Sequence, residues 1–326
     1  MLMAEKLNVL FTKKAKQPRN TRTLSRKSAA RRYNLALLAL CLPGLICLFL
    51  FKYLPMGGII IAFKNFAPMK GLFGSDWNGF KNFEFFFTSQ DAGRTIRNTV
   101  LYSVVFLISE LIFGVLIAVL LYNLRSRRGL KVYHTIIMLP KFMSIVVVSY
   151  IVYTVLHPSM GILNKLITAF GGEAISWYTE PKYWPFILTI THIWMIMGSG
   201  CLYYYSALTG IDPSLHEAAE IDGANAWQKT WHVSIPELVP IMVMMTILGI
   251  GGLFSGDMGL FYNVPRNMGL LYPATDIINT YTYRALLAGS LAKSAAVGLF
   301  QSVVGLILVT GTNAIIRKIS PENSMF

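Results

Sequence analysis

Two short stretches of the sequence imitate catalytic or nucleotide-binding motifs, and each lacks a decisive residue. His216 to Glu220 begins like the HExxH helix of zinc hydrolases, in which two histidines one turn apart bind the metal, but Glu220 stands in place of the second histidine. Gly74 to Gly79 has the glycine spacing of a phosphate-binding loop, but Phe80 follows where a lysine is required. We therefore expect no metal site, no catalytic residue and no bound cofactor in this chain.

A third stretch, EAAEIDGANAWQKTW at 217–231, is a soluble-looking segment between two long apolar runs. Asp212 and Pro213 suit the N-cap and first position of a helix, and Gly223 allows the chain to turn before a second short helix. Small side chains near this turn would let another surface approach closely: Ala218, Ala219 and Ala224. Such a shape suits docking into a partner's groove. A solvated connector explains the same residues equally well.

The composition favours an integral membrane protein. Of the 326 residues, 54% are hydrophobic and 13% charged, and the mean hydropathy is +0.53, which is outside the range of ordinary soluble domains. The net charge of +14 comes from basic residues beside apolar runs, where the positive-inside rule places them. We therefore expect a lipid bilayer, and no nucleic acid, as a partner. The three cysteines have no metal-ligand or disulfide spacing, and we expect them to be packing residues.

Six apolar stretches reach the length of about 20 residues that a membrane span needs, so the sequence predicts an all-α integral membrane protein with six transmembrane helices. The expected spans are 35–55, 98–122, 134–156, 184–207, 236–256 and 290–314. They lie in a transmembrane domain at 35–316, between a basic N-terminal tail at 1–34 and a C-terminal tail at 317–326. Basic loops such as 123–131, which includes Arg125, place both termini and the loop 208–235 in the cytoplasm. The N-terminal tail lacks the pattern of a cleaved signal peptide.

Two ionisable residues inside the predicted spans are candidates for function, because a polar group in the hydrocarbon layer must be paired or line a cavity. Glu110 falls near the middle of the second span, and Lys141 enters the third span at a similar depth. The two could therefore form an ion pair. A Glu110 that bonds a neighbouring helix for packing alone is an equally good interpretation.

The fourth predicted span carries a polar stripe. Four residues recur at spacings that place them on one helical face: Thr189, His192, Ser199 and Tyr203. Trp194 and Tyr204 lie on the flanking faces. Aromatic and hydroxyl groups suit sugars, although interhelical packing explains the stripe comparably well. On the sixth span, Lys293 near the outer end would snorkel or meet an anionic substrate.

The segment EAAEIDGANAWQKTWHVSIPELVP closely resembles the EAA motif of permease subunits of binding-protein-dependent ABC importers. The matching residues are Glu217, Ala218, Ala219, Asp222, Gly223, Ala224 and Pro236. Trp231 stands where phenylalanine is commoner. Three further segments, 74–83, 259–286 and 295–318, look like the carbohydrate branch of that family. The resemblance covers the chain from about residue 35 onward.

The resemblance implies that 208–235 is a coupling loop, whose helix lies between the fourth and fifth spans, seats in a groove of a cytoplasmic ATPase subunit and transmits its closure to the spans. It implies four partner chains: a second homologous permease, two copies of the ATPase subunit, which would bind ATP and Mg²⁺, and an extracytoplasmic substrate-binding protein. The location would be the bacterial cytoplasmic (inner) membrane. The substrate would be an oligosaccharide or a polysaccharide fragment.

Three basic residues favour an acidic sugar such as an alginate or pectin fragment: Lys141, Arg284 and Lys293. Two alternatives remain. An ABC permease for another solute would share the EAA motif but lack the three carbohydrate-branch segments. A channel or an intramembrane enzyme would work without any ATPase subunit.

Overall fold

Most of the described chain is helical, which confirms the predicted all-α class. The computed structural model describes residues 21–89, 91–124, 126–319 and 321. The chain divides into two units, Met1–Gly58 and Ile59–Phe326, each described by itself below. Arg125 and most of the two predicted tails, at 1–20, 320 and 322–326, lie outside the described residues. The division into tails and one membrane domain stays a prediction.

The first unit is a single helical rod made of α2 (Thr21–Leu48), the π-helical turn η1 (Phe49–Tyr53) and α3 (Leu54–Met56). Together with the 3-10 turn η2 (Gly57–Phe63), it contains a candidate membrane span at Tyr33–Phe63. Every described side chain from residue 33 to residue 57 is exposed, and most are apolar. A helix that is apolar on all sides suits the acyl chains of a bilayer.

The second unit contains the remaining helices and one short antiparallel strand pair. The α-helices are α4 (Gly71–Gly74), α5 (Lys81–Thr88), α6 (Ala92–Tyr122), α7 (Arg127–Met138), α8 (Ile145–Val155), α9 (Ile162–Ala169), α10 (Trp184–Thr209), α11 (Pro213–Ile221), α12 (Ala226–Lys229), α13 (Ile235–Gly251), α14 (Met258–Asn263), α15 (Tyr272–Thr275), α16 (Ile278–Leu287) and α17 (Leu291–Ile319). The shorter turns are η3 (Leu139–Phe142), η4 (Trp177–Thr179), η5 (Pro181–Tyr183), η6 (Thr230–Ser234) and η7 (Gly269–Leu271). The strands are β1 (Lys64–Asn65) and β2 (Asp76–Trp77).

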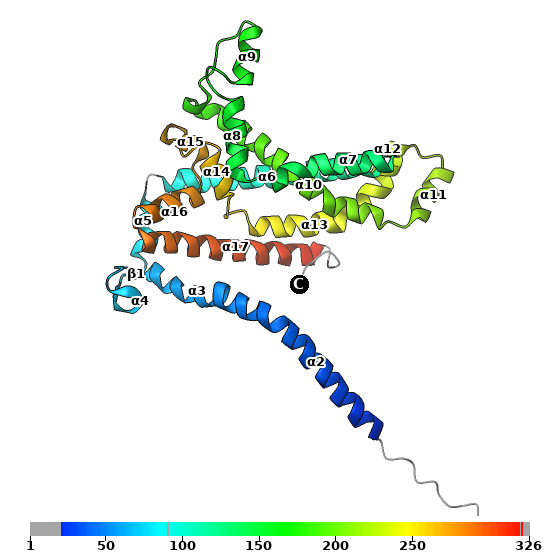
Figure 1. Ribbon diagram of the computed structural model, residues 1–326, viewed down its shortest axis with the longest axis horizontal. Helices are drawn as coiled ribbons and strands as arrows, with labels where there is room; N and C mark the ends of the chain where they lie inside the picture. Colours follow the sequence, from blue (N-terminus) through cyan, green and yellow to red (C-terminus); the bar gives the residue numbers. More distant parts are fainter. Residues whose placement is uncertain (1–20, 90, 125, 320, 322–326) are drawn as a thin grey trace, which may run out of the picture. The chain divides into compact units, whose positions relative to one another are not determined.

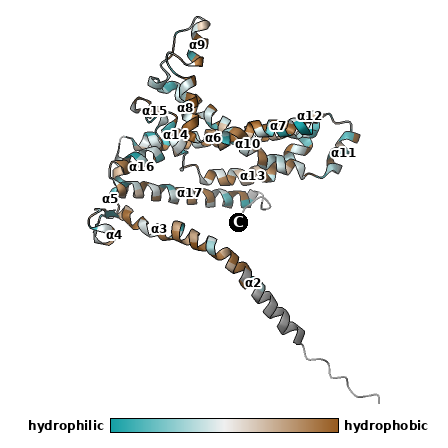
Figure 2. Cartoon of the chain, in the orientation of Figure 1, coloured by the Kyte–Doolittle hydropathy of each residue, from teal (hydrophilic) through white to brown (hydrophobic). Residues whose placement is uncertain are grey.

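Long helices form a bundle in the second unit. In Figure 1, α6, α10, α13 and α17 run side by side, with α6 against α10 and with α13 against both α10 and α17. Each belongs to a segment long and apolar enough to cross a membrane: Ala92–Tyr122, Pro181–Thr209, Ala226–Gly251 and Leu291–Lys318. Hydrophilic residues gather instead around α11 and α12 (Figure 2). These segments overlap the second, fourth, fifth and sixth predicted spans.

The third predicted span, 134–156, is not one continuous helix: the described residues contain five candidate spans, or six if this bent pair of helices counts as one broken span. Arg127–Phe142 and Ile145–Val155 meet at an angle of 98°. Pro140 in η3 has no backbone N–H to continue the helical hydrogen bonds. Met143 and Ser144 then adopt extended conformations, and the Ser144 hydroxyl caps α8 by accepting a hydrogen bond from the Val146 N–H at 3.3 Å. The chain therefore ends one helix and starts another inside the apolar run.

A cluster of buried aromatic and aliphatic side chains fixes α14 and α15 over one end of the bundle. It joins Tyr102 and Phe106 of α6 to Trp184 of α10 and to Leu260 and Phe261 of α14. The Trp184 indole N–H donates a hydrogen bond to the backbone oxygen of Trp177 at 2.8 Å. Polar side chains at this end of α6 therefore lie close to the segment that contains α15 and α16.

Candidate functional site

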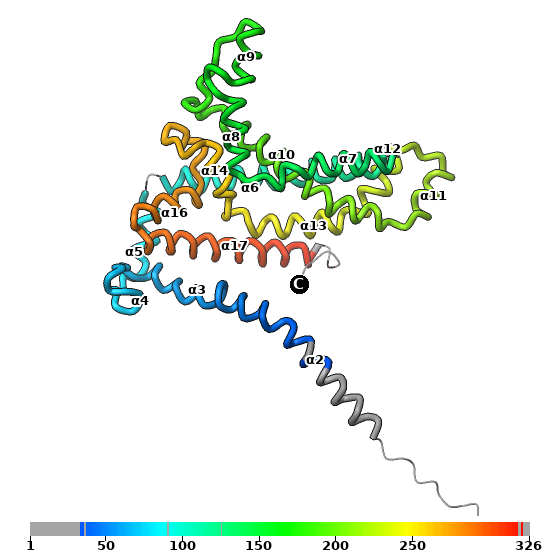
Figure 3. Tube along the Cα trace, viewed as in Figure 1, coloured from blue at the N-terminus to red at the C-terminus, as the bar shows by residue number. Residues whose placement is uncertain are grey.

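The loop between α10 and α13 begins with a capped helix, α11, whose path can be followed in Figure 3. The Asp212 side chain accepts a hydrogen bond from the Ser214 backbone N–H at 2.9 Å, and Pro213 occupies the first helical turn. This confirms the helix start predicted from the sequence. Residues 213–221 are thus held as a separate, short helix.

A left-handed turn ends α11. Gly223 has a φ of +79°, its N–H donates to the Glu220 oxygen at 3.1 Å, and the Ala224 N–H donates to the Ala219 oxygen at 2.9 Å. This is the hydrogen-bond pattern of a glycine-terminated helix, so the predicted turn at Gly223 is confirmed.

The second short helix does not stop before the next span. Asn225 and Gln228 form a reciprocal capping box at the start of α12. The chain then continues through η6 into α13, so one helical run extends from Ala226 to Gly251. The helix that contains the predicted fifth span therefore begins ten residues before residue 236, and the point at which it enters the membrane stays a prediction. The early start is possible because Pro236 lies in the first turn of α13, where its missing N–H is tolerated.

The turn and the helices beside it present apolar side chains to the outside. Ile221, Trp227 and Trp231 are 87%, 70% and 51% exposed, and the two indole rings pack at a centroid distance of 5.6 Å. Glu217, Ala218, Asp222 and Gly223 are also exposed, whereas Ala219 and Ala224 are half-buried. Large exposed apolar side chains on an otherwise hydrophilic segment are typical of a protein interaction surface.

Two open pockets are bordered by this segment. One of about 550 Å³ is lined by Glu217, Glu220 and Lys229 together with Tyr122 at the end of α6. The other, of about 320 Å³, is lined by Ala219, Asp222, Gly223 and Ala224 among others. The Tyr122 ring also contacts the His216 ring at 5.9 Å. The segment 212–231 therefore lies next to the end of α6, with pockets along it.

Replacing Asp212 with alanine is expected to loosen the first turn of α11, because the helix loses its N-cap. Amide hydrogen exchange of residues 213–221 in the purified protein should become faster, whereas Asp212→Asn, an equally good cap, should retain protection. The hydrogen bonds from Ser214 lower the pKa of Asp212 from its ordinary value of 3.8. The cap's contribution is thus complete above pH 3.8 and is lost as the pH falls through the lowered pKa. Unchanged exchange in Asp212→Ala would contradict this role.

Glu110 lies beside a residue of a neighbouring helix, as the second of its two interpretations has it, and not beside Lys141. Its carboxylate Oε1 lies 3.3 Å from Nε2 of His192 on α10. Lys141 lies in η3, at the bend between α7 and α8, and its side chain is exposed. The predicted Glu110–Lys141 pair assumed a straight third span, which the 98° bend removes. The His192 ring also stacks on Phe106, with centroids 3.7 Å apart and planes 9° apart.

The other residues that the sequence suggests as possible substrate contacts are dispersed. On α10, Ser199 donates to the Ile196 oxygen at 3.0 Å, Trp194 is half-buried, Tyr203 is 52% exposed and Tyr204 is buried at 4% exposed. On α17, the Lys293 ammonium lies 3.3 Å from the centroid of the Phe85 ring. Of the eight residues named from the sequence as possible substrate contacts, Glu110 and His192 approach each other, and Glu110 also interacts electrostatically with Tyr204.

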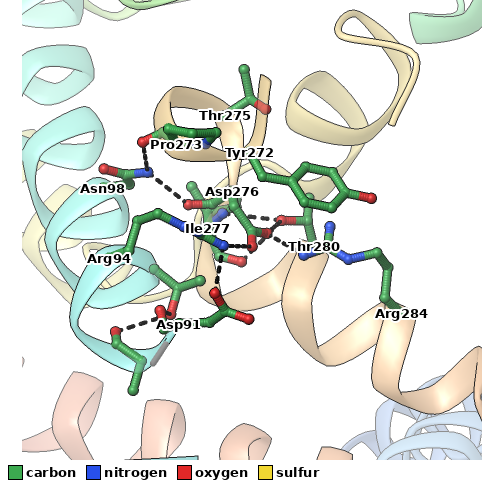
Figure 4. Close-up of polar contacts among 12 residues, drawn as sticks. Asp91, Arg94, Asn98, Tyr272, Pro273, Thr275, Asp276, Ile277, Thr280 and Arg284 are labelled. Carbon is green, nitrogen blue, oxygen red and sulfur yellow. Dashed lines mark hydrogen bonds and ion pairs between the residues drawn. The ribbon is translucent and has the colours of Figure 1, made fainter. Parts of the chain in front are cut away.

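A buried ion-pair network at the other end of α6 has no counterpart in the predicted site (Figure 4). The Asp276 side chain is fully buried, and its carboxylate lies 2.6 Å from Arg284 Nη2 and 3.3 Å from Arg94 Nη2. Thr280 donates a hydrogen bond to the same carboxylate at 2.7 Å, and the Asn98 amide donates to the Asp276 backbone oxygen at 3.0 Å. The network connects α6 to α15 and α16.

Arg284 therefore forms an internal ion pair, and its contact with an anionic substrate stays a prediction. Its guanidinium also lies over the Tyr272 ring, 4.1 Å from the centroid. A buried carboxylate with two arginines and a hydroxyl is fully paired, which indicates a structural function. The contact between α6 and this network has no local signal in the sequence, since Arg94 and Asp276 are 182 residues apart.

Comparisons with known proteins agree that this chain is similar to membrane components of transport systems. Residues 110–321 match the family described as the inner membrane component of binding-protein-dependent transport systems. Protein LplB of Bacillus subtilis (strain 168) is 33% identical over 284 residues, covering 87% of this chain and 89% of that one. The polygalacturonan/rhamnogalacturonan transport system permease protein YteP of the same organism is 36% identical over 290 residues, covering 86% and 87%.

Solved structures have the same fold. A chain of a bacterial ABC transporter involved in the import of the acidic polysaccharide alginate superposes with a TM-score of 0.81 at 30% identity, covering 90% of this chain and 99% of that one. A chain of a bacterial alginate ABC transporter in complex with an alginate pentasaccharide-bound periplasmic protein gives a TM-score of 0.80 at 29% identity, covering 89% and 96%. With a family match over residues 110–321 and relatives that align over most of its length, the chain belongs to the inner membrane components of binding-protein-dependent transport systems.

Proposed function

We propose that this chain is a permease subunit of an ABC importer that moves an oligosaccharide or polysaccharide fragment into the cytoplasm, with ATP hydrolysed on partner subunits. The chain itself would catalyse no reaction and would form part of the path that the sugar follows through the membrane. The observation that carries this proposal is the exposed segment 212–231, whose capped helix and apolar side chains form a surface for a partner outside the membrane. A cytoplasmic ATPase subunit that binds ATP and Mg²⁺ would occupy it.

The positions of the basic residues support an orientation with segment 212–231 in the cytoplasm. Arg127 and Arg128 begin α7, only a few residues after α6 ends at Tyr122, and Tyr122 contacts His216 of α11. Segment 212–231 and these arginines therefore lie at the same end of the bundle. Arginine-rich short loops favour the cytoplasmic side. With this orientation, both termini would be cytoplasmic and the Asp276 network would lie toward the outside.

The names of the relatives support an acidic sugar polymer as the substrate class. YteP is named for polygalacturonan and rhamnogalacturonan, and the two solved transporters are described for alginate. The lactose permease LacF of Rhizobium radiobacter, which is 30% identical over 58% of this chain, is a relative named for a neutral sugar. The periplasmic protein in the alginate complex supports an extracytoplasmic substrate-binding protein as a partner of this chain. A second homologous permease would complete the path.

The mechanism would be a population shift. Closure of the two ATPase subunits on ATP would pull on α11 and favour the outward-open bundle, and hydrolysis would return it to the inward-open state. Because α11 is capped at Asp212 and ended at Gly223, it would move as a rigid unit rather than unwind. The force would reach the spans through α12, which continues into α13 without a break.

The test is ATP hydrolysis and sugar uptake by the reconstituted complex, with and without loaded binding protein. Glu217→Lys reverses an exposed charge on α11, and Gly223→Pro forbids the positive φ of the turn. If the segment docks on an ATPase, either change should cost about 2 kcal/mol of docking energy, or roughly 30-fold in affinity, as at other interface hot spots. Stimulated hydrolysis and uptake should fall together.

Glu173→Lys provides the matched control. It makes the same charge change at an exposed position in the loop that follows α9, far along the chain from α11. This variant should still co-purify with the ATPase subunit. Uptake that is unaffected by Glu217→Lys and Gly223→Pro, or a complex that contains no ATPase, would refute the proposal and favour a channel or an intramembrane enzyme.

A further inference from the structure

Glu110 lies deep inside a membrane span. It is twelve residues before Tyr122, the last residue of the span Ala92–Tyr122, which corresponds to about 18 Å along the helix axis. The hydrocarbon layer is about 30 Å thick, so the carboxyl group is placed within it. Yet 47% of the Glu110 side chain is exposed on the surface of the chain.

An acidic side chain at this depth is costly to place against acyl chains, about 2.5 kcal/mol or more for an aspartate on insertion scales. The surface of α6 around Glu110 must therefore face water or polar groups rather than lipid. By contrast, Ile108 on the same helix is 51% exposed but is turned about 200° around the axis from Glu110. Its aliphatic side chain suits lipid or an apolar protein surface.

His192 packs behind Glu110 without a hydrogen bond between them. Its side chain is 9% exposed, its Nε2 is buried with no hydrogen-bond partner, and that atom is 3.3 Å from the Glu110 carboxylate. Stacking on Phe106 fixes the plane of the imidazole ring. Because Nε2 is inaccessible, an incoming molecule would meet the carboxylate and not the ring. By this close packing, and not by a hydrogen bond, His192 limits where the carboxylate can lie and is a positioning residue, whereas Glu110 is the group open to a ligand.

We propose that Glu110, positioned by His192, is a solute-binding group midway along the translocation path, where its carboxylate accepts hydrogen bonds from the hydroxyl groups of the passing sugar. The inference rests on the proposed transport function and adds a site and its chemistry to it. A carboxylate is a strong acceptor for hydroxyl donors and repels other carboxylates. An acidic polysaccharide would thus be held here by its hydroxyl edge, with its own carboxylates turned away.

Cysteine accessibility tests the position of Glu110 without knowledge of the substrate. In a background with Cys41, Cys47 and Cys201 replaced, the full complex is reconstituted in liposomes with Glu110→Cys and treated with a charged, membrane-impermeant methanethiosulfonate. A cysteine in an aqueous path should react at least about tenfold faster than the Ile108→Cys control, because the thiolate that reacts forms readily only in water. Labelling should also differ between nucleotide-free and ATP-vanadate-trapped complexes.

Ser103→Cys gives a second measurement of the labelling rate on the face of α6 that carries Glu110. A separation of seven residues places Ser103 within about 20° of Glu110 around the helix axis. Ser103→Cys should also react faster than Ile108→Cys, even if Glu110→Cys fails to assemble. Equal, slow labelling of the Glu110 and Ser103 variants in both nucleotide states would overturn the proposal, because it would place this face against protein or lipid. A wild-type complex that still imports sugar would leave the transport function standing.

Uptake of the alginate pentasaccharide, used as the probe with its binding protein, tests the chemistry. Glu110→Gln should reduce uptake roughly 10- to 100-fold, because it removes the charged acceptor but keeps the size of the side chain. His192→Phe keeps the ring on Phe106 and should reduce uptake less. If His192 acts through Glu110, the double variant should be no worse than Glu110→Gln alone, whereas additive losses would indicate separate structural effects and contradict the positioning role.

Discussion

Replacing Asp276 with alanine is expected to destabilise the protein by about 3–5 kcal/mol, because it leaves two arginines without their buried counter-ion. Asp276 is fully buried, and Arg94 and Arg284 both contact its carboxylate. The loss should appear as a lower thermal unfolding temperature of the purified complex. Faster amide hydrogen exchange is expected in residues 272–287, since the network joins α15 and α16 to α6.

Asp91→Ala is the control for this variant. Asp91 contacts the same Arg94 at 2.8 Å, but its side chain is 46% exposed, so its removal should cost less than about 1 kcal/mol. Asp276→Asn should fall between the two, because an amide oxygen can still accept the hydrogen bond from Thr280. Equal unfolding temperatures for Asp276→Ala and Asp91→Ala would mean that the buried network contributes no stability.

Hydropathy was enough to predict the spans, because a segment that crosses the bilayer must be apolar over a fixed length. The bend in the third span was missed for the same reason. The 98° turn between α7 and α8 occurs inside a continuous apolar run. The mean hydropathy of such a run is the same whether the helix is straight or bent. Pro140, followed by a serine that can cap a new helix, was the available local signal.

The ends of α11 were predictable because helix caps are local. Asp212, Pro213 and Gly223 act on neighbours within a few residues, and their types alone specify the backbone conformation. Polar partners across the bundle were not predictable in this way. Glu110 meets His192 and Asp276 meets Arg94 only because α6 packs against α10 and against the connection between α15 and α16, an arrangement that depends on the whole fold.

Replacing Gly198 with alanine is expected to disrupt the contact between α7 and α10. A Cβ atom added at Gly198 would lie 2.7 Å from the backbone carbonyl carbon of Ile137 and 2.9 Å from Cα of Met138. Backbone atoms cannot rotate away as a flexible side chain can, so α7 would have to move. Overpacking of this kind costs about 1–3 kcal/mol, and the moving element also carries the bend that leads to α8. We expect a lower thermal unfolding temperature and reduced uptake.

Gly200→Ala separates this contact from any general effect of alanine in a membrane helix. Gly200 is two residues further along α10, and the nearest atom to an added Cβ, Cα of Gly114, is 4.0 Å away, which is an ordinary contact. Both substitutions gain the same helix propensity, about 1 kcal/mol in water, so their difference isolates the clash with α7. Gly200→Ala should be neutral or stabilising. If the two variants unfold at the same temperature, α7 and α10 are not packed as closely as Gly198 requires.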